Sequence, residues 1–412
     1  MNANNYVNFD LIKFATLIGV LIILNYFLWS INSWQILRFI NFFFLITIFV
    51  YFFISKKFNY LWYLKLIIFL LLIICLGTPT IPIDSRTFFL LPGKILFYES
   101  DLYIRLSIYS STINFVGHDF LDTVFSRPKL ASSLSATFAQ ILGFWNDIFP
   151  KTINVIIILP AILFLISYFK DRVLIQLWLF SILFLSGKLF VNGLMDGILS
   201  LYFVSSILAT YKISITKSLY ERNKLYFLMF IFFIILSLSK HEGGVMVPLI
   251  LLSKFLLDFI YKSKFDYKYL LITIFSLLPI IFWRYIFLKS GSKMEFLHHG
   301  DPITRFIERL SSSDDLLTLF SFLVFNEKLI ISLVVFIICA FKFYSHNRKL
   351  ILFVTINFLL YFVALISAVM ISTHSVLEQL DQSSVRIFIP LVLLLVYFSI
   401  FLTKNNYSID KR

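Results

Sequence analysis

Charged side chains are scarce in this chain. Asp, Glu, Lys and Arg make up 14% of its 412 residues and 60% of the residues are hydrophobic, whereas an ordinary soluble domain carries about 25% charged residues. The apolar residues gather in runs of about 20 residues, the length that spans a bilayer as an α-helix. No single soluble core could accommodate so many runs of this length. The composition therefore argues against a soluble domain and predicts a polytopic membrane protein.

Cysteine and clustered histidine are also rare. Cys75 and Cys339 fall in apolar runs far apart in the sequence, so neither a disulfide framework nor a Cys metal cluster is predicted. The pair His298 and His299 has no nearby ligands at a recognisable spacing, which argues against a structural metal site. Internal repeats are not evident, and this weakens the case for a transporter built from two related halves.

What the chain does have is a succession of apolar runs. They predict twelve membrane helices at 11–30, 35–54, 60–77, 153–169, 173–190, 192–211, 225–240, 244–261, 269–288, 319–341, 350–372 and 387–403. The first run lacks a small-residue cleavage site and is followed by further spans, so we expect it to be a retained helix. The predicted fold is all-α: a single transmembrane bundle over residues 1–412 with two long loops, 78–152 and 289–318, on one side.

The net charge of +14 is distributed unevenly along the chain. Nearly all of the surplus positive charge lies in alternate loops and at the C-terminus, which contain Lys56, Lys57, Lys170, Arg172, Lys212, Lys217, Arg222, Lys224, Lys262, Lys264, Lys268, Lys342, Arg348, Lys349, Lys404, Lys411 and Arg412. The same segments contain few acids, whereas the 78–152 loop is balanced. Because cytoplasmic loops are enriched in Lys and Arg, both termini are predicted in the cytoplasm and 78–152 outside. The basic balance therefore needs no nucleic-acid partner.

The two long loops contain amphipathic stretches. Leu134, Phe138, Ile141 and Trp145 recur at spacings of three to four residues, the pattern of a helix that lies on a surface with its apolar face in lipid or protein. The 289–318 loop likewise alternates charged and apolar residues. Interfacial helices are therefore expected in the external loops.

Two polar islands contain acids next to apolar runs, where a charge is costly and usually has a partner or a task. Asp84-Ser85-Arg86, followed by Lys94, comes just after the third run. A carboxylate just beyond the membrane is a candidate catalytic base, although charges that merely pair in a solvated loop would explain these residues too. Asp196 begins an apolar helix, where an N-terminal capping role and a functional role are both open.

Two further islands contain cations. Lys240, His241 and Glu242 precede Gly243-Gly244 between two apolar runs; a polar turn explains the glycines better than it explains three ionisable side chains. Arg386 stands where the last helix is expected to begin. Its planar guanidinium suits a lipid phosphate, and interfacial snorkelling is the alternative.

Taken in order, these islands resemble the GT-C superfamily of membrane glycosyltransferases, which includes dolichyl-phosphate-mannose mannosyltransferases and aminoarabinose transferases. The elements that carry the resemblance are Asp84-Ser85-Arg86 with Pro92-Gly93-Lys94, Arg127-Pro128-Lys129-Leu130, Gly143-Phe144-Trp145-Asn146-Asp147, Gly193-Leu194-Met195-Asp196, Ser239-Lys240-His241-Glu242-Gly243, and Ser384-Val385-Arg386 with Pro390. His241 replaces the usual Asn, and Ser85 stands where many members have a second acid. Many members also place the catalytic acid after the first helix, whereas three apolar runs precede Asp84 here.

The resemblance implies an enzyme of the bacterial inner membrane that transfers a sugar from a polyprenyl-phosphate carrier to a glycan, lipid or protein acceptor on the external face. It implies Asp84 as the general base. Arg86, Lys94, Lys240 and Arg386 would bind the donor phosphate, while Asp196 and Glu242 would orient those cations or bind sugar hydroxyls. The sugar, the acceptor and any need for a divalent metal stay open.

Two alternatives belong to other classes. An O-antigen polymerase or ligase also has many helices and polyprenol-linked substrates, but its main external loop usually comes late in the chain, and here the longest loop comes early. A flippase or transporter for lipid-linked sugars would use intramembrane charges to line a path. Reconstitution separates these classes, because a flippase moves the carrier lipid without making a glycosidic bond.

Overall fold

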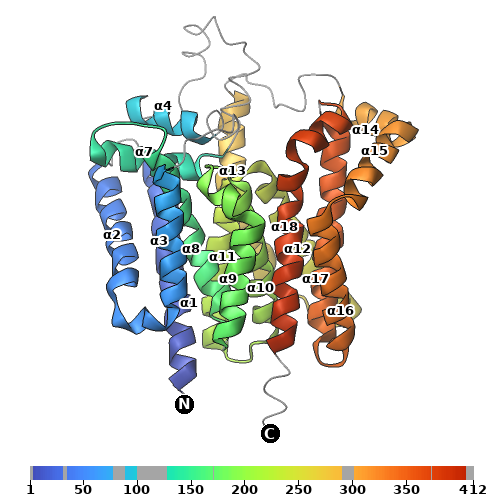
Figure 1. Cartoon of the computed structure of the whole chain (residues 1–412), viewed down its shortest axis with the longest axis horizontal. Helices are drawn as coiled ribbons and strands as arrows, with labels where there is room; N and C mark the ends of the chain where they lie inside the picture. The colour runs from blue at the N-terminus through green and yellow to red at the C-terminus, as the bar shows by residue number, and fades with distance from the viewer. Residues whose placement is uncertain are drawn as a thin grey trace, which may run out of the picture.

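The chain folds into a bundle of helices standing side by side (Figure 1). The computed structural model describes residues 3–30, 35–77, 89–99, 128–169, 171–289, 301–372 and 374–404. Within these ranges every regular element is a helix and no strand occurs. Eleven of the described helices are long and apolar enough to cross a membrane, or twelve if one bent pair is a single span. The predicted all-α, multi-pass helical bundle is therefore confirmed.

The long helices alternate in direction when the bent pair that precedes the last two is counted as one span (Figure 1). They are α1 (Ala3–Ser30), α2 (Gln35–Ile54), α3 (Trp62–Gly77, which continues the turn η1 at Lys56–Leu61), α8 (Ile153–Ile166, preceded by the turn η3 at Phe149–Thr152), α9 (Arg172–Val191), α10 (Asp196–Ile215), α11 (Leu219–Ser239), α12 (His241–Ile260), α13 (Lys268–Lys289), α17 (Tyr344–Ile371) and α18 (Val376–Lys404). The start of α1 and the end of α18 lie at the same end of the bundle (Figure 1). We call it the terminal end, and the opposite end the far end.

Shorter helices cover the far end. They are α4 (Leu91–Glu99), α7 (Leu130–Leu142), α14 (Pro302–Ser311) and α15 (Ser313–Val324). The helix α7 lies over α1 and α2 with α4 beside it, and α14 and α15 lie beside the upper part of α17 (Figure 1). The helix expected over Leu134–Trp145 corresponds to α7, which ends at Gly143 because that residue adopts a left-handed conformation (φ 79°).

Two predicted spans differ from the structure. The helix expected over 319–341 is broken into α15 and α16 (Glu327–Lys342), which meet at 62°. The break falls where Asn326 caps α16 by accepting a hydrogen bond from the Leu329 amide (3.1 Å). The helix expected from 387 begins at Val376 instead, although its apolar span starts at Arg386.

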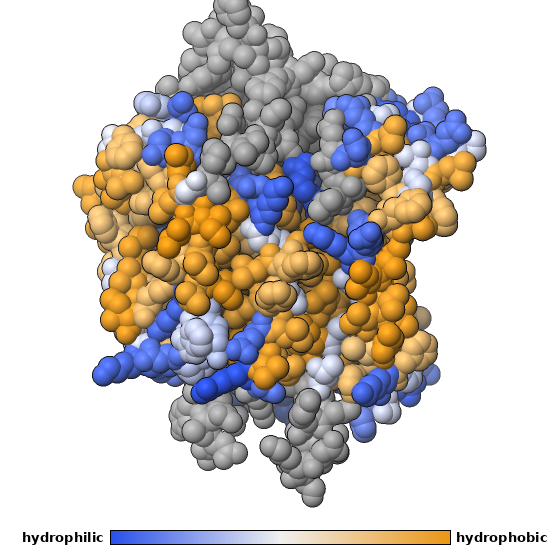
Figure 2. Space-filling view, in the orientation of Figure 1, coloured by the Kyte–Doolittle hydropathy of each residue, from blue (hydrophilic) through white to orange (hydrophobic). Residues whose placement is uncertain are grey.

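The interior of the bundle is formed by α8, α10, α11 and α18, and every residue of α8 is buried. Tyrosine hydroxyls join these helices: Tyr202 donates to the Ile157 carbonyl (2.7 Å) and Tyr397 to the Leu165 carbonyl (3.1 Å). Hydrophobic residues dominate the middle of the face in Figure 2, and hydrophilic residues gather toward its two ends. This arrangement is that of a protein whose sides face lipid and whose ends face water.

Buried polar contacts attach α7 to α1. The indole of Trp29 donates to Thr137 Oγ1 (2.8 Å), and the Thr137 hydroxyl lies 3.1 Å from Asn25 Oδ1. The Arg38 guanidinium of α2 stacks 3.7 Å from the Trp29 ring. Hydrogen bonds between buried polar groups fix the direction of the helices that carry them, so these contacts hold α7 in place over the far ends of α1 and α2.

Arginines of α14 cap the end of α17. Arg309 donates to the carbonyls of Val369 (3.0 Å), Met370 (3.2 Å) and His374 (2.6 Å). Arg305 Nε donates to the Ile371 carbonyl (3.2 Å). The last carbonyls of a helix lack partners within it, and here a neighbouring helix supplies them.

Candidate functional site

An ammonium group stands between two carboxylates at the far end. Lys240 Nζ lies 2.9 Å from Asp196 Oδ1 and 2.8 Å from Glu242 Oε1. The Asp196 side chain is 3% exposed and the Lys240 side chain 14%, whereas Glu242 is 36% exposed. We call these three residues the charged triad. One of its carboxylates is thus fixed inside the protein and the other reaches the surface.

The backbone conformation of the α11–α12 linker places Lys240 at this position. It is the only residue between α11 and α12, and it adopts an extended conformation (φ −159°, ψ 163°). Two apolar helices therefore reverse direction across a single residue. The lysine side chain must then lie at the helix ends, beside the N-terminus of α10.

Asp196 is positioned by the preceding turn. Asn192 ends α9, and Gly193 follows in a left-handed conformation (φ 78°), which glycine adopts without steric cost. Asp196 then opens α10, where the helix dipole favours a negative charge. Its carboxylate accepts from Lys240. Asp196 is thus the acid of the first helical turn and the buried partner of a cation.

A second pair of polar side chains lies next to the charged triad. Arg284 Nη2 of α13 is 3.2 Å from Nδ1 of His241, the residue between Lys240 and Glu242. Arg284 is partly buried. Its neighbour Trp283 is 4% exposed, and the buried Lys129 ammonium at the start of α7 lies 4.4 Å from that ring. Arg284 therefore adds a second cation close to the triad.

Tyr361 of α17 completes the surroundings of the triad. This buried tyrosine lies within electrostatic range of the Asp196 and Glu242 carboxylates, and its ring lies 5.1 Å from that of Phe203 in α10. Four long helices, α10, α12, α13 and α17, together with the α11–α12 linker, thus contribute to one polar region. A cluster of charged residues that several helices contribute at the end of a membrane bundle is typical of a functional site.

Sequence reasoning missed Arg284 and Tyr361. Arg284 could have been recognised from the sequence, because it is a permanently charged residue near the end of the apolar run 269–288. Tyr361 could not, since a tyrosine in an apolar run is ordinary.

The other predicted site residues are not members of the triad. Asp84 and Arg86 lie outside the described residues. Lys94 is exposed on α4. Arg386 is partly buried ten residues into α18, where the apolar span of that helix begins.

The charged triad and Arg284 together have two chemical capabilities. The nearby guanidinium of Arg284 can attract an anionic group such as a phosphate, whereas the Lys240 ammonium already contacts two carboxylates. The carboxylates of the triad can orient that ammonium or accept hydrogen bonds from hydroxyl groups. Among the described residues, no group of three or more His, Cys, Asp or Glu side chains could hold a metal ion. Comparisons of the chain with protein-family models, with curated proteins and with solved structures found no match.

Proposed function

We propose that this chain is a membrane glycosyltransferase that takes a sugar from a polyprenyl-phosphate carrier at the far end of the bundle. The observation that supports this proposal is the charged triad, in which Lys240 is held between Asp196 and Glu242 at the edge of the apolar region. A buried ion cluster costs desolvation energy. Such a cost is explained when the charges meet a polar substrate that reaches the site from the membrane, with Arg284 close to the triad to bind its phosphate.

The reaction breaks the bond between the anomeric carbon and the phosphate oxygen and forms a bond from that carbon to an acceptor hydroxyl oxygen. The departing polyprenyl phosphate keeps the electron pair, so cations aimed at its oxygens stabilise the transition state. A carboxylate takes the hydroxyl proton, which contributes about 10²–10⁴-fold to the rate.

In this proposal Asp84 is the base, and Lys240 and Arg284 bind the phosphate together with Arg86, Lys94 and Arg386. Asp196 holds Lys240 in its orientation. Glu242, the more exposed acid, binds sugar hydroxyls. The acceptor is a glycan, a lipid or a protein.

An apolar groove gives the proposal a place for the carrier chain. A cavity of about 830 Å³ lies between α1, α11 and α13 and is lined almost entirely by hydrocarbon side chains, including Phe27, Phe230, Leu278 and Phe282. The helix α13 forms one of its walls and also carries Arg284, two residues after Phe282. We propose that the isoprenoid chain occupies this groove while its phosphate lies at the end of α13.

The test uses polyprenyl phosphate, the product common to every sugar donor of this class. The full-length protein in nanodiscs is titrated with polyprenyl phosphate, and transfer is measured separately in membranes with a panel of polyprenyl-phosphate sugars. The triple variant Asp196→Asn, Lys240→Met and Glu242→Gln is expected to lose both binding and transfer. A matched control removes the Lys57–Asp10 ion pair (2.7 Å), which lies away from the triad, and should keep both.

Asp84→Asn separates catalysis from binding. It should bind the carrier normally and lose transfer by about 10²-fold or more. Wild-type transfer by Asp84→Asn at normal expression would exclude Asp84 as the base. Movement of the carrier across a vesicle membrane without a new glycosidic bond would instead identify a flippase, and formation of polyprenyl-linked polymer would identify a polymerase.

A further inference from the structure

A second charged cavity lies at the terminal end of the bundle. It has a volume of about 200 Å³ and is enclosed by the end of α10, the start of α11, the end of α12, the α12–α13 connection, the start of α13 and the start of α17. Because Lys254 and Asp258 follow Glu242 on α12 and the helix rises about 1.5 Å per residue, this cavity is about 18–24 Å from the charged triad. It is therefore a separate site, which we call the basic pocket.

The carboxylates of the basic pocket are engaged with the protein itself. Asp258 forms a buried ion pair with Lys254 and accepts a hydrogen bond from the Ser263 hydroxyl (2.8 Å). Asp266 accepts hydrogen bonds from the Tyr226 hydroxyl and from the Lys268 amide (3.0 Å). Both acids thus stabilise the walls, and Asp258 already neutralises one of the pocket's lysines.

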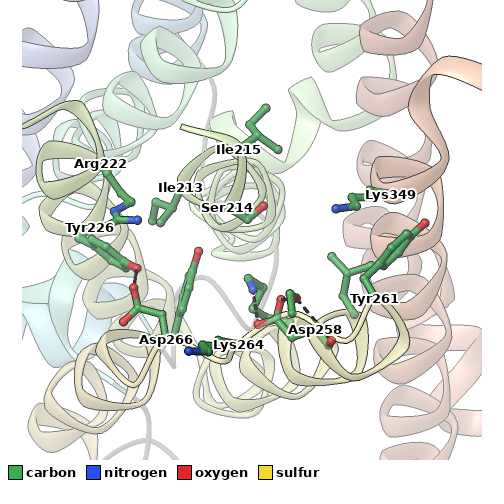
Figure 3. Close-up of a pocket in the computed structure, with 14 residues that line it drawn as sticks. Ile213, Ser214, Ile215, Arg222, Tyr226, Asp258, Tyr261, Lys264, Asp266 and Lys349 are labelled. Carbon is green, nitrogen blue, oxygen red and sulfur yellow. Dashed lines mark hydrogen bonds and ion pairs between the residues drawn. The ribbon is translucent and has the colours of Figure 1, made fainter. Parts of the chain in front are cut away.

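Three further cations face the cavity from three different directions. Arg222 enters from α11, Lys349 from α17 and Lys264 from the α12–α13 connection (Figure 3). Within the part of the chain that the structure describes, none of the three forms an ion pair. Arg222 Nε is buried and has no hydrogen-bond partner among the described residues. A buried guanidinium nitrogen without an acceptor is costly, and an anion in the cavity would supply one.

The size and location of the cavity restrict the anion. About 200 Å³ is less than the roughly 300–1,000 Å³ of pockets that hold drug-sized ligands, so the cavity is too small for a nucleotide sugar. It suits a phosphate group, which an arginine fork and two lysines can bind together. The pocket also lies at the end of the apolar helices, the depth of lipid headgroups, and basic pockets between membrane helices recognise anionic headgroups.

We propose that the basic pocket binds a phosphate group through Arg222, Lys264 and Lys349, carried either by an anionic lipid headgroup or by a small soluble phosphate ester. Occupation of the pocket joins α11, the α12–α13 connection and α17 through one ligand. This binding does not depend on the glycosyltransferase proposal, since it involves neither the triad nor the groove.

The experiment distinguishes the two sources of phosphate. Full-length protein is placed in phosphatidylcholine nanodiscs with or without phosphatidylglycerol, and retained phosphatidylglycerol is counted by native mass spectrometry. The soluble probe is glycerol 3-phosphate, titrated calorimetrically into protein in phosphatidylcholine alone. The variant Arg222→Gln, Lys264→Gln, Lys349→Gln is compared with Lys217→Gln, Lys262→Gln, Lys342→Gln, which removes the same charge from residues that do not line the pocket.

We expect the pocket variant to bind about a hundredfold more weakly than the control, because it loses the attraction of three cations. Specific retention of phosphatidylglycerol identifies a lipid headgroup, and saturable binding of glycerol 3-phosphate identifies a soluble ester. Lys349→Gln alone alters an exposed side chain and guards against misfolding of the triple variant. It should weaken binding about fivefold. Equal binding by the pocket and control variants, unchanged binding by Lys349→Gln, or no binding of either probe to the wild type overturns the proposal.

Discussion

Gly243 packs so closely against α11 that an ideal Cβ on this residue would lie 1.8 Å from the carbonyl oxygen of Leu236. The one-residue linker brings the first turn of α12 against the last turns of α11, and no side chain fits between them. The neighbouring Gly244 is different, because a Cβ there would meet only Ile280 Cδ1 at 3.5 Å, an ordinary contact. The two adjacent glycines therefore make a matched pair.

Gly243→Ala should destabilise the protein and disturb the charged triad, while Gly244→Ala should change little. Overpacking costs about 1–3 kcal/mol, and the added methyl group would push Lys240 and Glu242 away from Asp196. Unfolding can be followed by labelling of Cys75, which is fully buried, in a Cys339→Ser background. Equal melting temperatures for the two alanine variants would contradict the expectation.

The charged triad should respond differently to the loss of one member and to the loss of all three. Lys240→Met leaves the Asp196 carboxylate, 3% exposed, without its cation, and breaking a buried pair costs about 3–5 kcal/mol. The triple neutral variant removes the uncompensated charge and should recover most of that stability without recovering carrier binding. Thermal unfolding of both variants, measured beside polyprenyl phosphate binding, tests the difference. If the triple variant is as unstable as Lys240→Met, the three side chains stabilise the fold through contacts other than the attraction between their charges.

Filling the apolar groove should weaken binding of the carrier. Leu278 lines the groove and is 47% exposed, whereas Ile274, one turn earlier on α13, is 48% exposed and does not line it. Leu278→Trp should raise the Kd for polyprenyl phosphate about tenfold, since a tryptophan occupies volume that the isoprenoid chain needs, and Ile274→Trp should leave it unchanged. Titration in nanodiscs measures both. Identical Kd values would place the chain outside the groove.

Asp266 should give the stability of the terminal end a dependence on pH. Burial alone would raise the pKa of this carboxyl, but hydrogen bonds from the Tyr226 hydroxyl and the Lys268 amide, with the charges of Lys268 and Arg222, hold the pKa below the ordinary 3.8. A carboxyl whose pKa is lower in the folded state stabilises the fold above its unfolded pKa, and this stabilisation is lost as the pH falls through the folded-state pKa.

Asp266→Asn removes that titration. The difference in melting temperature between the wild type and Asp266→Asn should stay constant from pH 7 to about 5 and shrink below about pH 4. Glu221→Gln, on an exposed residue of the same end, controls for the general change in charge. A difference as large at pH 3 as at pH 7 would contradict the assignment.

The positions of the helices were largely predictable because a bilayer imposes a length on them. Residues 35–54 were predicted as one helix, and the structure has α2 at Gln35–Ile54. The break at Asn326 was not predicted, although Asn326, Glu327 and Lys328 form a polar interruption within the apolar run 319–341. The early start of α18 was missed because its first turns carry Glu378 and Asp381 and lie outside the apolar run.

The individual residues of the charged triad could be predicted from the sequence, but the contacts between them could not. Alternation of spans placed Asp196, Lys240 and Glu242 at the same end, but the sequence could not show that Lys240 contacts both acids. That contact depends on α10 packing beside the α11–α12 turn, and Asp196 is 44 residues away from Lys240 along the chain. The pairing of His241 with Arg284 likewise depends on helix packing.

Arg309 shows that an arginine near a membrane surface is not automatically available to lipid. Its guanidinium is already occupied by the carbonyls of Val369, Met370 and His374, so a lipid phosphate would have to displace them to bind it. At the terminal end, by contrast, the buried Arg222 Nε of the basic pocket has no hydrogen-bond partner among the described residues. The two ends of the bundle therefore present different amounts of available positive charge to the lipid headgroups beside them. Anionic lipids should gather preferentially around the terminal end.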